Sequence, residues 1–105
     1  MQIQVNTDNN IDGREAVIED VQERAQAKLR PVASHLTRVE IHLADLNAPK
    51  GGPDDMRCMA EARPEGRNPI AVTHNDESLG KAVTGALDKL RAAVESDLGK
   101  RAARG

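Results

Sequence analysis

Residues 78–104 constrain the fold most, because their pattern fits only one regular element. Apolar residues recur there at steps of three and four, the spacing of one helical stripe: Leu79, Val83, Ala86, Leu87, Leu90, Val94 and Leu98. The spacing predicts one long amphipathic helix, which Ser78 or Asp76 caps. At roughly 100° per residue, Lys89 lies on one flank of the stripe and Arg91 on the other. We expect both cations to lie beside the packed face and to reach outward.

Four further segments alternate between apolar and polar residues, the period of half-buried strands. They cover residues 1–6, 37–46, 56–63 and 68–74. The alternation places one set of side chains on the core face of the two middle strands: Val39, Ile41, Leu43, Cys58, Ala60 and Ala62. A polar set is expected on the opposite face of the sheet: Gln2, Gln4, Arg38, Glu40, His42, Arg57, Glu61 and Arg63.

A second helix is predicted between the first two strands, at residues 13–29. Asp12 and Glu15 have the spacing of a capping box at its start. Pro31 disfavours helical geometry in the residue before it and marks the end of the helix or a change of direction. Two Pro and two Gly among residues 47–55 predict a mobile hairpin loop.

These elements predict an α+β fold with the order β-α-β-β-β-α in a single domain spanning residues 1–105. Three strands joined by hairpins form an antiparallel meander, and two amphipathic helices bury their stripes economically on one face of a four-stranded sheet. The first strand is expected beside the second or at an edge. With no Phe, Tyr or Trp, the core consists of aliphatic side chains, and binding of nucleic acid by base stacking is excluded.

The charge is distributed unevenly along the chain. Residues 1–77 contain nine Lys/Arg and fourteen Asp/Glu, a net −5, whereas residues 78–105 contain six and three, a net +3. The C-terminal helix therefore offers cations to a polyanion over a Debye length of about 8 Å. The competing interpretation is an ordinary solvated helix face with Asp97 and Arg101 paired at i,i+4.

No group of residues has the spacing of a catalytic or metal site. No pair of the three histidines, His35, His42 and His74, is spaced as metal ligands. Asp54 and Asp55 are two adjacent loop carboxylates without further oxygen ligands. Cys58, the only cysteine, cannot form an internal disulfide and lies on the predicted core face, where a thiol is inert. We therefore expect no enzyme, no cofactor, no metal and no small-molecule substrate. The lone cysteine, the lack of a leader and the lack of a long apolar run predict a cytoplasmic protein without membrane contact.

Two segments resemble a known family. Residues 85–90, Gly-Ala-Leu-Asp-Lys-Leu, match the Gly-x-x-Asp-Lys-Leu helix segment of the ribosome hibernation-promoting factors, also called ribosome-associated inhibitor A or sigma-factor modulation proteins. Residues 3–10 are similar to their first strand and turn, and the element order is similar over essentially the whole chain. The resemblance is to the short form, which lacks a C-terminal dimerisation domain.

The resemblance implies a fold like that of double-stranded-RNA-binding domains and a non-enzymatic role. Family members bind the small ribosomal subunit and silence translation in stationary phase or stress, through Lys and Arg contacts to the ribosomal RNA backbone. Another hibernation factor is a further candidate partner. The positions that the resemblance marks as RNA-binding are Arg24, Lys28, Lys89, Arg91, Lys100 and Arg101.

A second function class stays open beside the first. The predicted first helix carries Glu15, Glu19, Asp20 and Glu23, and the chain as a whole has a net charge of −2. These features favour an alternative: a protein-interaction module of the same fold that has lost its affinity for the ribosome.

Overall fold

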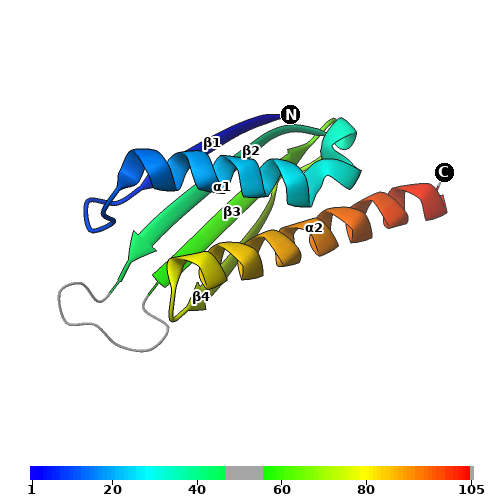
Figure 1. Cartoon of the computed structure of the whole chain (residues 1–105). Coiled ribbons are helices and arrows are strands. Elements are labelled where there is room, and N and C mark those ends of the chain that lie inside the picture. Colours follow the sequence, from blue (N-terminus) through cyan, green and yellow to red (C-terminus); the bar gives the residue numbers. More distant parts are fainter. Residues whose placement is uncertain (47–55, 105) are drawn as a thin grey trace.

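The computed structural model describes residues 1–46 and 56–104, and Figure 1 shows the predicted β-α-β-β-β-α order with one added 3₁₀ segment, η1. The predicted hairpin loop at 47–55, Gly105 and the side chains of residues 101–104 lie outside this description. The elements are β1 (Gln2–Thr7), α1 (Arg14–Leu29), η1 (Arg30–His35), β2 (Leu36–Asp45), β3 (Met56–Pro64), β4 (Ile70–Asp76) and α2 (Leu79–Arg104).

The strands form one mixed sheet in the order β1-β2-β3-β4. β1 runs parallel to β2, as the α1 crossover between them requires, and the β2-β3 and β3-β4 pairs are antiparallel. The register aligns Val5 with Ile41, Ile41 with Ala60, and Ala60 with Val72 across all four strands. The predicted meander is confirmed, and β1 lies both beside β2 and at an edge.

Both helices lie on the same face of the sheet, as predicted (Figure 1). α1 packs on β1, and α2 packs on β3 and β4. The predicted core faces of β2 and β3 are almost fully buried, as are these stripe residues of α2: Val83, Ala86, Leu87, Leu90 and Val94. Burial of each larger aliphatic side chain contributes about 1.5 to 3 kcal/mol, so this helix stripe is a major source of stability. The arrangement agrees with the double-stranded-RNA-binding-domain-like fold that the resemblance implies.

The opposite face of the sheet is polar, also as predicted. Arg38 forms an ion pair with Glu40 at 2.8 Å and donates a hydrogen bond to Gln4. Arg57 donates to the side-chain oxygen of Asn75 at 3.2 Å. These contacts link neighbouring side chains across the open face, which packs against neither helix.

The predicted capping box at the start of α1 is wrong. Gly13 occupies the N-cap position with φ of 65°, and no side chain caps the helix. Glycine adopts this left-handed conformation without steric penalty, so the chain turns into the helix one residue after Asp12. The end of α1 agrees with the prediction, because η1 follows at once with Pro31 in its first turn.

The start of α2 confirms Ser78 as the cap. The Lys81 backbone N–H donates to the Ser78 hydroxyl oxygen at 3.2 Å, and the Ala82 N–H donates to the Ser78 carbonyl at 2.9 Å. Asp76 accepts a hydrogen bond from the Glu77 N–H at 2.8 Å, just before the helix. Both predicted capping residues therefore bind backbone N–H groups, and Ser78 is the one at the N-cap position.

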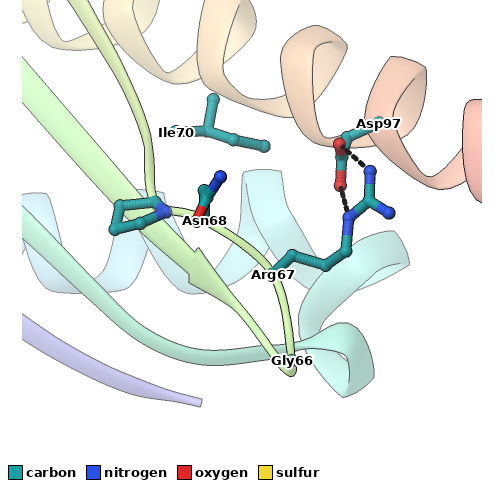
Figure 2. A pocket seen from close by; sticks show the side chains of 6 residues that line it. Gly66, Arg67, Asn68, Ile70 and Asp97 are labelled. Atoms are coloured by element: carbon teal, nitrogen blue, oxygen red, sulfur yellow. Dashed lines mark hydrogen bonds and ion pairs between the residues drawn. The ribbon is translucent and has the colours of Figure 1, made fainter.

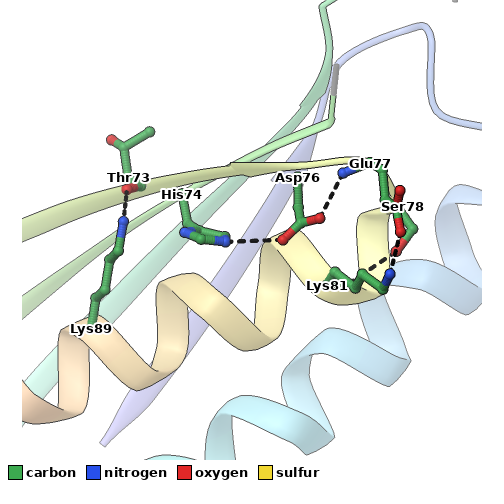
Figure 3. Close-up of polar contacts among 7 residues, drawn as sticks. All are labelled: Thr73, His74, Asp76, Glu77, Ser78, Lys81 and Lys89. Atoms are coloured by element: carbon green, nitrogen blue, oxygen red, sulfur yellow. Dashed lines mark hydrogen bonds and ion pairs between the residues drawn. The ribbon is translucent and has the colours of Figure 1, made fainter. Parts of the chain in front are cut away.

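A glycine in the middle of α2 makes room for a side chain from the sheet. The His74 ring of β4 points at α2 in Figure 3, and a Cβ atom added to Gly85 would lie 2.2 Å from its Cδ2 atom and 2.6 Å from its Cγ atom. Relief of this clash would require the His74 ring to rotate away from α2 or the helix to move away from the strand. Gly85 therefore sets how closely α2 approaches β4.

We predict that Gly85→Ala destabilises the protein although alanine is the better helix former. The clash with His74 is expected to lower stability by about 1 to 3 kcal/mol, against a gain of about 1 kcal/mol in helix propensity. In a His74→Ala background the same change should raise stability, because only the propensity gain remains. Thermal unfolding of the four variants in this double-mutant cycle measures the inversion; destabilisation of equal size in both backgrounds would contradict the contact.

Candidate nucleic-acid interface

A groove between the two helices brings together three of the predicted RNA-binding residues. It has a volume of about 430 Å³ and is lined by Arg24, Ala27 and Lys28 of α1 and by Thr84, Leu87 and Arg91 of α2. The cations come from both walls, because each helix turns this flank of its buried stripe toward its neighbour. A phosphate group in this groove would meet basic side chains on two sides.

Each groove cation already has a carboxylate partner. Arg24 pairs with Asp20 at 2.9 Å and Arg91 with Glu95 at 2.7 Å, both at i,i+4 on one helix. Lys28 of α1 pairs with Asp88 of α2 at 2.6 Å, so this pair joins the helices. All three pairs are substantially exposed, and exposed ion pairs contribute only about 0 to 1 kcal/mol each. The cation of such a pair can release its carboxylate and bind another anion at little cost in free energy.

Lys89 lies on the other flank of α2, away from this groove. Its ammonium group donates to the Thr73 carbonyl oxygen at 3.2 Å (Figure 3). Thr73 belongs to β4, an edge strand of the sheet. The bond ties α2 to this edge and leaves the charge of Lys89 without a carboxylate partner among the contacts of the described residues. The predicted placement of Lys89 and Arg91 on opposite flanks is confirmed.

The two remaining predicted residues lie near the C-terminal end of α2. Lys100 is exposed and has no hydrogen-bond or ion-pair partner within residues 1–46 and 56–100. Arg101 is helical, and its side chain lies outside the description. Asp97, which the sequence offered as a partner of Arg101, binds Arg67 of the β3-β4 turn through hydrogen bonds of 2.8 and 3.3 Å (Figure 2). The six predicted residues thus form a groove set of three, one residue on the outer flank and two at the helix end.

The segment that carries the family resemblance also holds α2 in place. Gly85 makes room for His74, Asp88 pairs with Lys28, and Lys89 bonds the β4 backbone. Leu90 is fully buried. Sequence reasoning missed the role of Asp88, because its partner lies 60 residues away in the chain. The Asp in the motif was the available signal, because it lies on the same flank of the buried stripe as Arg91.

The structure also describes the surroundings of Cys58 and His74, two other residues that the sequence singled out. Cys58 is buried, and the loss of solvation raises the pKa of its thiol to about 12. His74 lies 3.1 Å from Asp76, and the pKa of that carboxyl is lowered first by the Glu77 backbone N–H and then by His74. Within residues 1–46 and 56–104, no three His, Cys, Asp or Glu side chains gather as metal ligands. Asp54 and Asp55 lie outside the description.

None of the helices in the described part is both long and apolar enough to cross a membrane.

The fold and the groove define a small helix-on-sheet module with basic residues between its helices. Residues 3–102 match the family described as Sigma 54 modulation protein / S30EA ribosomal protein, so the chain belongs to that family. This confirms the resemblance seen in residues 85–90 and makes the protein a member of a ribosome-associated family. A comparison with curated protein sequences gives no match.

Two solved structures share the fold. A ribosomal subunit interface protein from Coxiella burnetii is similar with a TM-score of 0.69 and 14% identity, covering 94% of this chain and 99% of that one. The Protein Y N-terminal domain from Thermus thermophilus is similar with a TM-score of 0.66 and 22% identity, covering 91% of this chain and 98% of that one. At these identities the two structures support the fold.

We predict that Cys58 does not react with thiol reagents in the folded protein. With a pKa of about 12, roughly one thiol in ten thousand is ionised at pH 8, and the thiolate is the reactive form. A colorimetric disulfide reagent should modify the native protein only as fast as it unfolds, and the protein in denaturant within seconds to minutes. Rapid labelling of the native protein would contradict the burial of this thiol.

Proposed function

We propose that this protein is a non-enzymatic ribosome-binding factor that contacts the RNA backbone of the small ribosomal subunit. Membership of a ribosome-associated family supports binding to the ribosome. The convergence of Arg24, Lys28 and Arg91 in one groove between two helices supports the RNA backbone as the contacted group. Bound there, the protein inhibits translation or stabilises idle ribosomes during stationary phase or stress. It acts in the cytoplasm, and another hibernation factor is a candidate partner.

The chemistry of the groove suits phosphate better than bases. Guanidinium groups bind phosphate oxygens through two parallel hydrogen bonds, and Lys supplies a point charge. The chain has no Phe, Tyr or Trp to stack on a base. Lys89 and Lys100 extend the contact along the outer flank and the C-terminal half of α2, where their charges have no carboxylate partner among the described contacts. We include Arg101 in the same extension, next to Lys100.

One observation favours the alternative function, a protein-interaction module of the same fold without ribosome affinity. The groove cations are all paired with carboxylates of the protein itself, so the groove adds no net positive charge. A protein partner with charges of both signs could replace these carboxylates at the groove cations with carboxylates of its own, as RNA could with its phosphates. The two functions differ in whether binding survives nuclease treatment and in how steeply it falls with salt.

A charge-removal variant on the groove tests the proposal. Arg24→Gln with Arg91→Gln should weaken co-sedimentation with small ribosomal subunits at low salt, because two guanidinium contacts to phosphate are lost. Since both cations are already paired with carboxylates, the slope of log affinity against log salt concentration should change by less than about 0.7 to 0.9 per contact, the change expected for an unpaired cation. Arg57→Gln with Arg63→Gln is the matched control, since it removes the same charge from the open face of the sheet.

Three outcomes of this experiment are informative. Equal weakening by the groove variant and the sheet variant would assign binding to overall charge and reject the groove. Wild-type protein that does not co-sediment at any salt concentration would reject ribosome binding. Recovery of a partner protein after nuclease treatment would then support the alternative. Far-UV circular dichroism of both variants checks that the helices remain folded.

A further inference from the structure

The three cations of the groove between α1 and α2 each have an anion partner within the protein. Asp20, Asp88 and Glu95 supply one carboxylate for each of the three cations, at 2.6 to 2.9 Å. At roughly 100° per residue, Asp88 and Glu95 fall on the same flank of α2 as Thr84 and Arg91, and Asp20 falls on the same flank of α1 as Arg24. The carboxylates therefore lie next to the cations that line the proposed phosphate path.

We propose that these three carboxylates compete with RNA phosphate for the groove cations and so set the affinity and the salt dependence of ribosome binding. The inference rests on the proposed function and concerns the regulation of that same groove. Each phosphate that enters takes a cation from a carboxylate of the protein. The carboxylate left behind then repels the phosphate until it acquires a counterion of its own.

This competition has a signature that ordinary basic surfaces lack. When a free Lys or Arg neutralises a phosphate, the RNA releases a condensed counterion, and affinity falls steeply with salt. When the cation is already paired, the released counterion is offset by one that the freed carboxylate takes up. The groove contacts should then contribute little to the salt dependence, whereas Lys100, which has no partner within residues 1–46 and 56–100, contributes in full.

Asp88 is expected to be the strongest competitor. Its pair with Lys28 is the shortest of the three, and Lys28 has the least exposed side chain among the three cations, at 35%. The pair also joins α1 to α2, so the carboxylate is held in place by both helices instead of by one exposed turn. A phosphate that displaces Asp88 from Lys28 must therefore break a contact between the helices. A phosphate that binds Arg24 or Arg91 breaks only a contact within one helix.

Neutral substitutions of the three carboxylates test the competition. Asp20→Asn, Asp88→Asn and Glu95→Gln should each tighten binding to purified small ribosomal subunits by about two- to five-fold at low salt, the range expected for exposed ion pairs. Asp88→Asn should have the largest effect. Each variant should also steepen the dependence of log affinity on log salt concentration by up to about 0.7 to 0.9.

Glu19→Gln is the matched control for net charge. Glu19 is exposed on α1 next to Asp20 in the chain, but it lies roughly 100° around the helix and forms no ion pair with a groove cation. The control should change binding much less than Asp20→Asn. Equal tightening by all four variants would assign the effect to overall charge and overturn the competition.

Failure of the competition is distinguishable from failure of ribosome binding. If wild-type protein binds and the three carboxylate variants bind with the same affinity and salt dependence, the competition is overturned and the proposed function stands. If wild-type protein does not bind but the triple variant does, the competition is supported in its strongest form. Binding by neither overturns both. Thermal unfolding of each variant checks that the fold is retained.

Discussion

The structure depends on the burial of the apolar stripe of α2 against β3 and β4. Ala60 and Ala62 present small side chains on the buried face of β3, and Gly85 leaves space for the His74 ring of β4, so the helix can lie close to the sheet. Two polar contacts then hold the helix on the sheet side: Lys89 donates a hydrogen bond to the Thr73 carbonyl oxygen, and Asp97 accepts one from Arg67. Once the stripe is buried, the direction around the helix of each charged residue of α2 up to Lys100 is fixed.

That orientation decides which cations can act together. Arg91 faces α1 and joins Arg24 and Lys28 in the groove, whereas Lys89 faces the β4 edge. The residues of the family motif belong to the same packing, since Gly85, Asp88, Lys89 and Leu90 each contact another part of the fold. The motif therefore maintains the geometry from which the groove follows. Because the groove cations are balanced by carboxylates, we propose that affinity for RNA depends on exchange between anions more than on long-range attraction.

The fold was largely predictable from the sequence, whereas the ion-pair partners of the cations in the candidate site were predictable only in part. Alternation and helical periodicity report burial, which acts locally on each element, so the core faces of β2, β3 and α2 agree with the prediction. The cap at Gly13 was missed because the glycine conformation outweighed the Asp12 pattern. Arg24 and Arg91 each pair with a carboxylate four residues away on the same helix, a spacing that can be read from the sequence. The pair between Lys28 and Asp88 forms only when the two helices pack together. Positions of cations were therefore predictable, and their partners only in part.

The central claim is that the groove between the helices faces ribosomal RNA while the open face of the sheet does not. Directed hydroxyl-radical cleavage tests it most directly, with an iron chelate attached to Thr84→Cys in the groove or to Met59→Cys on the open face. The buried thiol of Cys58 should leave the introduced cysteine as the only labelled site. We predict cleavage of small-subunit RNA from the groove position and little from the sheet position. Cleavage from the sheet position alone, or from neither while the labelled protein remains bound, would contradict the claim.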